Sequence, residues 1–521
     1  LDTREILYAI SPDPTYHVHV LSSILHAEQL LPKLEIPPEA PEEEVKKIVE
    51  EYRKKLVEEA LDYIGSRFAI GRPREERIAR AQRLLDERLL PHIGIDSSRE
   101  TRILKAVFIG QMIARIIELM LGYREADDKD HYRNKRLKLA GDMLATLIRA
   151  SLVAFIRDLR EELEKQISKM RRAELKAVFK YTSVTDKILH AMATGNWPGG
   201  RTGVSQLLDR TNMLSTLSHL RRVVSPLTRT QPHFEARELH GTQWGRICPL
   251  ETPEGTNIGL VKNLALVANV SVGIDDHEVE ELLYDLGVVP IVTRKIRGRV
   301  KKGYLDLVIE GLNRGEPAGE KFAEWSKVFL NGKLIGYHPD GENLAKTIRE
   351  LRRKGKLSPE VNVAHIRTEH INEVVLNTDA GRIRRPLIVV ENGKPKLTKD
   401  IAERVKRGEL SFDDLVKMGV VEYIDPDEEE NTYIALTPDH VTREHTHLEL
   451  WVPGIFGITA SIIPYAEHNQ SPRNMYEAAM AKQALGLSTA SFQRRVDTRG
   501  HLLHYPQKPL VETRAIEIIG Y

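Results

Sequence analysis

The sequence contains a single cysteine, Cys248, in 521 residues. One thiol excludes a disulfide framework and a Cys₂His₂ zinc site within this chain, and it fits a reducing cytoplasm, where we expect the protein to reside. Net charge is nearly absent as well, because 77 Lys and Arg face 75 Asp and Glu, which leaves +2. Bulk charge therefore predicts no nucleic-acid partner, and only local clusters of charge can do so.

Familiar enzyme and export signatures are also missing. The chain has no Walker phosphate loop, no Gly-x-Ser-x-Gly elbow and no His-Glu-x-x-His motif, and its first residues do not predict a signal peptide. The most apolar run, residues 103–123, is long enough to cross a bilayer, but Lys105, Arg115 and Glu118 interrupt it. Because charge at the centre of a bilayer is costly, we predict a buried helix and no membrane partner.

The two ends of the chain look cut. It begins with Leu1 rather than methionine, and it closes on "AIEIIGY", which has a strand-like pattern. We expect a piece of a larger polypeptide, although processing also explains the start.

The apolar pattern changes near residue 190. Residues 1–188 predict mainly helices, because apolar residues recur at helical spacing and glutamates precede lysines by four positions. Strand-like runs follow, among them "GVVPIVT" and "YLDLVIEGL", and Asn331-Gly332 predicts a type I′ hairpin. "IRELRRKGK" predicts a short basic helix. The pattern as a whole predicts a multidomain α+β mosaic without internal repeats.

Two polar clusters have ambiguous readings. The acidic run Asp425 to Glu430 predicts a solvated turn. His440, His445 and His447 lie close in sequence, and the last two share one face of a predicted strand. A metal site is possible there, but a third ligand with suitable spacing is not evident, so we favour a structural role.

The segment from Arg201 to Leu264 carries eight cations against five anions. Its cations are mostly arginines, which suit bidentate phosphate contacts, and polar residues that suit sugar and phosphate lie between them. In "ETPEGTNIG", Pro253, Gly255 and Gly259 predict tight turns. Composition alone favours a surface loop between domains over a nucleic-acid site.

Four motifs go beyond composition: "LSHLRR", "GTQWGRICPLETPEGTNIGLVKNL", "HNQSPRNMYEAAMAKQALG" and "HYPQKPLVETRA". Together they resemble the second-largest subunit of multisubunit DNA-directed RNA polymerases. Weaker echoes such as "DDKDHYRNKRLKLAG" and "NTDAGRIRRPLIVV" extend the resemblance over essentially the whole chain. The "SPRN" and "HLRR" forms, with the short "GNWPGGRTG" loop, resemble the archaeal branch of the family, either its undivided form or the N-terminal product where the gene is split.

The resemblance implies an order of domains, with helical segments followed by mixed α/β ones. The implied boundaries are a lobe at 1–130, incomplete at its start, the second protrusion segment at 131–188, a fork at 189–272, external domain 1 at 273–355, external domain 2 at 356–455 and the start of the hybrid-binding domain at 456–521.

The resemblance also implies the chemistry, which is nucleotidyl transfer assisted by two metal ions. In the family, Mg²⁺ is held mainly by the largest subunit, and a further acidic pair lies downstream of the point where this sequence stops. We therefore expect no catalytic residue and no metal ligand in this chain, and no polymerisation by the chain alone. The implied partners are the other polymerase subunits, above all the largest one, the DNA template, the RNA transcript and nucleoside triphosphates (NTPs), in a nucleoid-associated complex.

The resemblance assigns roles to particular residues. Arg473 matches the arginine that faces the phosphates of the incoming NTP, and Tyr476, about one helical turn later, can buttress it. Lys482 and Gln483 match positions near the RNA 3′ end and the hybrid. The fork positions are Arg221, Arg222 and Arg229, for downstream DNA or hybrid phosphates, and Glu251, Thr252, Glu254 and Gly255, for support of the active centre.

The helix that carries Arg473 is predicted to begin with Ser471 as N-cap and Pro472 as its first residue. An arginine at the positive end of a helix dipole is unfavourable in isolation, but opposite a triphosphate it becomes part of an anion site. Lys482 lies nine residues later, roughly 13 Å along the helix, and on the opposite face.

Each role has a plainer alternative. Arg222 could hold the fork through salt bridges, and Asn469 and Gln470 could only cap loops. Trp244 and Tyr505 are predicted as core residues rather than base-stacking platforms. For the whole chain, the alternative is a non-catalytic scaffold or transcription-regulating module that retains the polymerase fold. The near-zero net charge argues against a third possibility, an independent nucleic-acid-binding protein.

Overall fold

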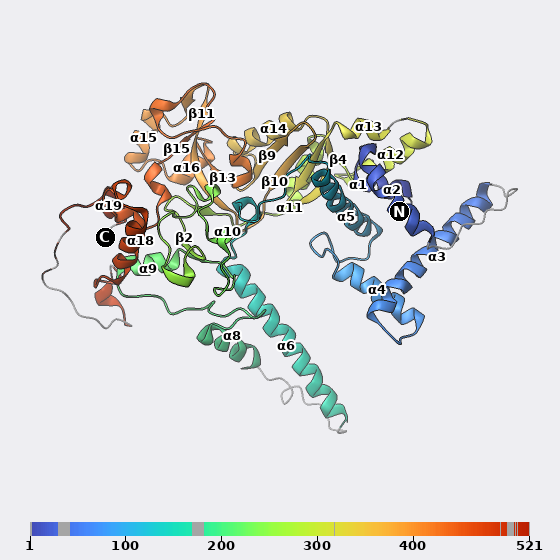
Figure 1. Ribbon diagram of the computed structural model, residues 1–521, viewed down its shortest axis with the longest axis horizontal. Helices are drawn as coiled ribbons and strands as arrows, with labels where there is room; N and C mark the ends of the chain where they lie inside the picture. The colour runs from blue at the N-terminus through green and yellow to red at the C-terminus, as the bar shows by residue number, and fades with distance from the viewer. Residues whose placement is uncertain are drawn as a thin grey trace. The chain divides into compact units, whose positions relative to one another are not determined.

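The computed structural model describes residues 3–29, 42–168, 182–316, 318–489, 491–496, 505, 507 and 509–519. The chain forms two compact units, each assembled from separate segments (Figure 1). Unit 1 comprises Leu1–Asp127, Asp275–Arg352 and Lys356–Thr378, and unit 2 comprises Asp128–Ile274, Arg353–Gly355 and Asp379–Tyr521. Both units mix helices with small sheets, as the multidomain α+β prediction requires. Within the described residues, the structure contains no helix with the length and apolarity needed to cross a membrane.

Unit 1 combines helices with a five-stranded sheet of order β4-β8-β7-β10-β9, in which only β7 and β10 run parallel. Its core joins Ala9 and Val107 to Tyr304, Val308 and Phe329, so early and late segments share one interior. The helices are α1 (Thr3–Ile10), α2 (Pro14–Gln29), α3 (Glu42–Phe68), α4 (Arg74–Glu87), α5 (Arg99–Met120), α11 (Asp276–Asp285), α12 (Tyr304–Asn313), α13 (Ala318–Ala323) and α14 (Gly341–Arg353). The strands are β4 (Val289–Pro290), β5 (Arg294–Ile296), β6 (Arg299–Lys301), β7 (Ser326–Leu330), β8 (Lys333–His338), β9 (Asn362–Arg367) and β10 (Asn372–Asn377).

Some of the secondary-structure predictions made from local sequence in unit 1 are confirmed, and others are wrong. The predicted hairpin is confirmed, because Asn331 and Gly332 join β7 to β8 with φ values of 49° and 79°. The basic helix at "IRELRRKGK" is confirmed as part of α14. The strand predicted at "YLDLVIEGL" is wrong, since these residues form α12. Its buried side chains include Tyr304, Leu305 and Val308. A short apolar run of this kind fits both the helical period of 3.6 residues and the strand period of two.

The helix predicted over residues 103–123 is confirmed as α5, but it is buried on one face only, because Met112, Ile116 and Met120 are more than half exposed. Its buried charges are all partnered. The Lys105 ammonium donates to the carbonyl oxygens of Leu85, at 3.0 Å, and Asp86, at 2.6 Å. The Glu118 carboxylate accepts from the Arg124 guanidinium at 2.9 Å. Burial is tolerated because each charge regains in the protein the polar contacts that it loses from water.

Unit 2 is organised around one strand, β11, which pairs with four others. The main sheet has the order β12-β11-β15-β14, and β13 and β3 also pair with β11. The long helix α6 packs beside α8 (Figure 1). The helices are α6 (Ala140–Ser168), α8 (Thr182–Thr194), α9 (Met213–Leu220), α10 (Phe234–Arg237), α15 (Lys399–Lys406), α16 (Phe412–Lys417), α17 (Pro426–Glu429), α18 (Ser471–Gln483) and α19 (Arg514–Ile519). The strands are β1 (Arg222–Val224), β2 (Val261–Asn263), β3 (Asn269–Val270), β11 (Ile383–Glu391), β12 (Lys394–Pro395), β13 (Val421–Ile424), β14 (Ile434–Ala435) and β15 (His447–Glu449).

Short 3₁₀ turns complete the element order. They are η1 (Tyr132–Asn134), η2 (Gly241–Gln243), η3 (Gly255–Asn257), η4 (Pro438–His440), η5 (Val452–Ile455), η6 (Ala460–Ile462), η7 (Ala466–His468) and η8 (Phe492–Arg494). The strand-like pattern of "AIEIIGY" is a wrong prediction, because the described part of this run belongs to α19.

The acidic run Asp425 to Glu430 is not the predicted solvated turn. It contains α17, and the side chains of Asp425 and Glu428 are buried. Arg246 is fully buried and places a guanidinium nitrogen 2.5 Å from a carboxylate oxygen of Glu429. Arg385 lies 2.5 Å from the other oxygen of the same carboxylate. The acidic residues are inside because buried arginines need counter-charges there.

The three clustered histidines have separate partners. His447 is buried, with its Nε2 at 3.4 Å from Glu422, whereas the ring of His445 stacks on Tyr433 with centroids 4.3 Å apart. His440 contacts the hydroxyl of Thr437. Among the described residues, no three His, Cys, Asp or Glu side chains are grouped to hold a metal ion.

Candidate nucleic-acid interface

The loop before α18 is fixed by asparagines rather than by the predicted serine cap. Gln470 occupies the N-cap position without a side-chain hydrogen bond, and Ser471 is already the first helical residue, so the predicted cap is wrong. Asn474 is buried and donates to the carbonyl of Ala466 at 2.7 Å. Asn469 donates to Asn474 at 3.0 Å, which agrees with its loop-capping alternative. A proline in the first turn needs no hydrogen-bond partner, so Pro472 can follow.

Arg473 and Tyr476 form the exposed face of the first turn of α18. The guanidinium carbon of Arg473 lies 5.9 Å from the centroid of the Tyr476 ring, within the range of a cation–π contact. Arg473 is exposed, Tyr476 is half-buried, and within the described part of the chain Arg473 pairs with no carboxylate. The positive charge therefore remains available to an external anion.

In the last turn of α18, the side chain of Lys482 is directed toward the protein interior. The Lys482 ammonium lies 2.9 Å from the Glu251 carboxylate, and their side chains are 19% and 1% exposed. Ser218 donates to the same carboxylate oxygen at 2.6 Å. The second oxygen of Glu251 is buried without a hydrogen-bond partner among the described residues. Gln483, the next predicted residue, is exposed.

Gly457 explains how Glu251 fits. A Cβ atom on Gly457 would lie 2.2 Å from the unpartnered oxygen of Glu251, so only glycine leaves room for the carboxylate. The structure thus brings Lys482, Glu251 and Ser218 together from three distant segments. Sequence spacing alone did not predict this contact.

The three predicted arginines differ in their surroundings. Arg221 follows α9, is half-buried, and donates to the carbonyl of Ala265 at 2.5 Å. Burial lowers its pKa, an effect that the charge of Glu251 partly offsets. Arg222 begins β1 opposite Asn263, and Arg229 lies in an exposed loop. In the described residues neither of these two arginines pairs with a carboxylate, which argues against the salt-bridge alternative for Arg222.

The turn-rich loop around residue 255 is held from inside. The hydroxyl of Thr252 donates to Val261 and accepts from the amide of Gly259, both at 3.0 Å. Glu254 and Gly255 are exposed, and Gly255 has a φ of 73°. Thr252 therefore supports the loop, whereas Glu254 faces solvent.

Sequence reasoning missed the residue that ties this loop to its neighbour. The Arg237 guanidinium donates to the carbonyls of Pro232, at 2.6 Å, and of Thr256 and Ile258, both at 2.8 Å. The sequence signal that could have identified Arg237 is an arginine placed among proline and glycine turns. Loop carbonyls that have no strand partners need hydrogen-bond donors, and an arginine can supply several.

His219 is a second missed residue. Its Nδ1 accepts the amide of Asp209 at 3.1 Å, and its Nε2 lies 3.1 Å from the side-chain oxygen of Gln206. Burial and then the nearby Arg222 charge lower the pKa of His219, so the ring is neutral at physiological pH.

Both aromatic predictions were wrong. Trp244 is 41% exposed, and its indole nitrogen donates to Glu449 at 3.0 Å. Tyr505 is 95% exposed. Aromatic residues are buried only on average. Tryptophan often lies partly exposed, with its ring against apolar neighbours and its N–H bonded to a polar group.

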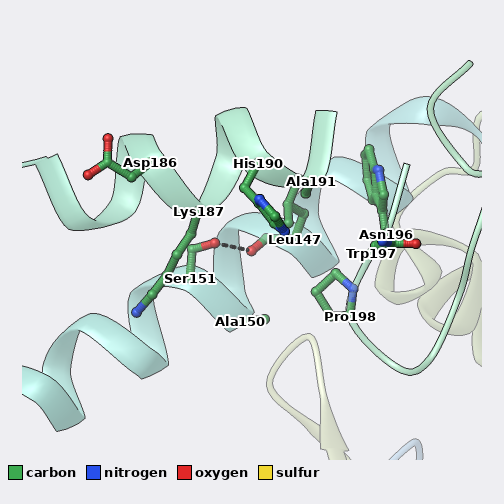
Figure 2. Close-up of a pocket in the computed structure, with 10 residues that line it drawn as sticks. All are labelled: Leu147, Ala150, Ser151, Asp186, Lys187, His190, Ala191, Asn196, Trp197 and Pro198. Carbon is green, nitrogen blue, oxygen red and sulfur yellow. Dashed lines mark hydrogen bonds between the residues drawn. The ribbon is translucent and has the colours of Figure 1, made fainter. Parts of the chain in front are cut away.

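A hollow of about 510 Å³ lies between α6 and α8, away from the residues predicted as a site. Figure 2 shows Leu147 and Ser151 of α6 facing Lys187 and His190 of α8, with Trp197 at one end. The Ser151 hydroxyl donates to Leu147 at 2.9 Å, so it already has a partner. None of the predicted residues lines this hollow, so we do not include it in the interface.

Comparison with known families matches most of the described chain. Five profiles described as domains of "RNA polymerase Rpb2" match: domain 2 at residues 4–138, domain 3 at 206–270, domain 4 at 328–391, domain 5 at 412–450 and domain 6 at 459–521. The residues of the interface fall within the matches to domains 3 and 6.

Curated relatives give the same result. DNA-directed RNA polymerase subunit Rpo2 of Saccharolobus shibatae is 55% identical over 521 residues, which is 100% of this chain and 43% of the relative. The Sulfolobus acidocaldarius subunit Rpo2 is 53% identical over 99% of this chain and 42% of its own length. Subunit 2 of DNA-directed RNA polymerase II from Arabidopsis thaliana is 40% identical over 89% of this chain and 38% of its own length. The chain therefore spans less than half of each of these relatives.

Proposed function

We propose that this chain, which belongs to the second-largest-subunit family of multisubunit DNA-directed RNA polymerases, forms one wall of the active-centre cleft. In that position it holds the incoming NTP and the RNA–DNA hybrid during DNA-templated RNA synthesis. The observation that carries the proposal is α18, which presents an exposed arginine at its start and is tied at its end to the 206–264 segment through Lys482 and Glu251. Both segments lie where the family profiles match.

At the start of α18, Arg473 would bind the phosphates of the NTP. The positive end of the helix dipole and a guanidinium together make a two-part anion site. Tyr476 would hold the guanidinium from below through its ring, at the 5.9 Å separation observed. The positive charge and the dipole repel each other mildly until a polyanion arrives.

At the end of α18, Lys482 and Gln483 would contact the RNA 3′ end and the hybrid. Because Lys482 pairs with a buried carboxylate, its position is defined before nucleic acid binds. Glu251 and Thr252 would act from behind as supports, and Glu254 and Gly255 would shape the exposed loop. Arg222 and Arg229 are the freer of the fork arginines for phosphates, since Arg221 already uses one nitrogen on Ala265.

The chemistry requires metal ions that the described residues do not fit. Glu251 faces an ammonium, and the described part of the chain has no group of three metal-ligating side chains. As the resemblance implies, we propose that Mg²⁺ is held mainly by the largest subunit and that this chain is active only within a complex. The other subunits, the DNA template, the RNA transcript and NTPs are its proposed partners.

The domain boundaries implied by the sequence remain part of the proposal: lobe, protrusion, fork, two external domains and the start of the hybrid-binding domain. The alternative, a non-catalytic module with a polymerase fold, is disfavoured because the relatives that cover all of this chain carry names of polymerase subunits.

The test is transcription by the enzyme assembled around a subunit that carries Arg473→Ala. We expect the NTP concentration for half-maximal elongation to rise about tenfold or more, because a charge-assisted contact contributes roughly 1.5–3 kcal/mol. The matched control is Arg74→Ala, which removes another exposed arginine from the first turn after a proline. An unchanged NTP dependence in the Arg473 variant would refute the nucleotide role. Template-dependent RNA made by the isolated chain would refute its dependence on partners.

A further inference from the structure

Asn212 joins two helices that are far apart in the sequence. Its side chain is completely buried. The side-chain oxygen accepts the amide of Ser215 at 2.7 Å, which caps the start of α9. The side-chain nitrogen donates to the carbonyls of Ala481 at 2.9 Å and Ala484 at 2.6 Å, at the end of α18. One amide group thus serves the beginning of one helix and the end of another.

The orientation of this amide follows from its surroundings. If oxygen and nitrogen were exchanged, an oxygen would face two carbonyls and an NH₂ group would face a backbone N–H. The arrangement observed matches the electrostatics of both helices, because the positive start of α9 meets an acceptor and the negative end of α18 meets donors. Carbonyls in the last turn of a helix have no partner within the helix, and Asn212 provides one for two of them.

A second tie connects the same two helices. Near the end of α9, Ser218 donates to Glu251, and Glu251 pairs with Lys482 in the last turn of α18. Asn212 also lies close to the chain beyond α18, because a Cβ atom added to Gly486 would lie 3.4 Å from the Cβ of Asn212. The last turn of α18 is therefore held by both ends of α9.

We propose that Asn212 is a positioning residue, which fixes the last turn of α18, and with it Lys482 and Gln483, to the helix that precedes the fork arginines. The structural part of this proposal, the joint opening of the two helix ends, stands independently of the proposed polymerase role. The kinetic part rests on that role. No other side chain of this size combines an acceptor with two donors, so the function belongs to the amide rather than to the volume of Asn212.

The structural part is tested by hydrogen exchange of the purified chain. Asn212→Ser keeps an acceptor that caps α9 and removes both donors to α18. We expect exchange at residues 481–486 to become about tenfold faster, with a smaller change at residues 213–217. Ser215→Ala reverses the design, because it weakens the cap of α9 and leaves the Asn212 nitrogen in place. It should speed exchange in α9 and leave the end of α18 protected.

A third variant and the unsubstituted chain complete the test. Asn212→Asp keeps the cap but points an anionic oxygen at two carbonyls, so it should loosen the end of α18 at least as much as Asn212→Ser. Protection of residues 481–486 equal to that of the unsubstituted chain in both Asn212 variants would overturn the proposal. If the variants do not fold, the unsubstituted chain decides: protection of residues 213–217 and 481–486 should agree within about threefold, and unrelated values would overturn the joint opening.

The kinetic part is tested in the assembled enzyme. Asn212→Ser should lower kcat for nucleotide addition about tenfold with little change in KM for the NTP, because it displaces the RNA-facing end of α18. Arg473→Ala should give the opposite split. Faster exchange without a lower kcat would restrict Asn212 to a structural role and overturn the positioning role. A normal KM in the Arg473 variant would instead count against the proposed NTP site.

Discussion

The buried ion pair between Arg246 and Glu429 offers a test of what holds unit 2 together. Arg246 is fully buried and also donates to the carbonyls of Ile383 at 2.9 Å and Ile424 at 3.2 Å. Glu429→Gln removes the carboxylate that neutralises it at 2.5 Å. Arg385, the other partner of Glu429, keeps its ion pair with Glu449. The substitution therefore removes the carboxylate that pairs directly with a buried guanidinium, and only the more weakly interacting Asp425 remains as a negative charge for Arg246.

The expected cost is about 3 kcal/mol. Breaking a buried ion pair by removing one partner typically costs about 3–5 kcal/mol, and the lower end applies because the Glu429 side chain is 22% exposed. The loss is a large fraction of the stability of an ordinary domain. Amide exchange of β11 is the assay, because a chain with two units need not unfold in one step. Exchange through global opening of unit 2 should become roughly 100-fold faster.

Two controls decide whether the charge matters. Glu409→Gln removes an exposed partner of Arg404 and Arg407, so β11 exchange should not change. Combining Glu429→Gln with Arg246→Met removes both charges and should recover much of the loss. If β11 exchange is unchanged in Glu429→Gln alone, the explanation given for the buried acidic run is refuted.

The same pair predicts the pH dependence. Burial alone would raise the pKa of Glu429, but the guanidinium groups of Arg246 and Arg385 lower it below its ordinary value. Folding therefore favours the ionised carboxylate, whose contribution is complete above the unfolded pKa of about 4.3 and is lost as the pH falls through the folded pKa. The stability difference between the unsubstituted chain and Glu429→Gln should be full at pH 7 and shrink below about pH 4.

Three further substitutions test separate features. Gly457→Ala should displace Glu251 and free Lys482, which mass spectrometry should detect as faster acylation of Lys482. Gly241→Ala is the control and should leave this acylation rate unchanged, because no atom lies within 4 Å of its added Cβ. Burial, and then the charge of Lys135, lowers the pKa of Lys262 to about 8. The acylation rate of Lys262 should therefore show a pH midpoint near 8, and Lys135→Met should move this midpoint upward. A midpoint near 10 in the unsubstituted chain would contradict this prediction. Gly332→Ala should destabilise the β7–β8 hairpin by about 1 kcal/mol, because the φ of Gly332 is 79°. The loss should be measured as faster hydrogen exchange of the hairpin amides. Equal exchange in the variant and the unsubstituted chain would argue against the turn geometry.

Local signals allowed correct prediction where neighbours in sequence decide the structure. Asn331-Gly332 determines its own turn, and Arg473 meets Tyr476 because residues three apart share a helix face. The wrong predictions involve partners far away in the chain. The acidic run around Glu429 is interior because Arg246 lies there, and no property of the run itself indicates this.

In the candidate site, too, contacts between residues far apart in the sequence were not predicted. Arg473, Lys482 and Glu251 were identified by motif, but the pairing of Lys482 with Glu251 depends on the tertiary fold. Asn212, Arg237 and Asn474 were missed because asparagine and arginine are ordinary surface residues. Burial with satisfied hydrogen bonds distinguishes Asn212 and Asn474, and several hydrogen bonds to loop carbonyls distinguish Arg237.

The interleaving of the two units has a consequence for biosynthesis. Leu1–Asp127 leaves the ribosome before roughly 150 residues of unit 2, and only then does Asp275–Arg352 bring the core partners Tyr304 and Val308. At about 5–20 residues per second this delay is on the order of 10–30 s. During it the apolar residues Ala9 and Val107 have no completed core. The nascent chain should therefore present a binding surface for chaperones early in synthesis. Ribosome-bound chains arrested before residue 304 should be more sensitive to protease than those arrested after residue 378.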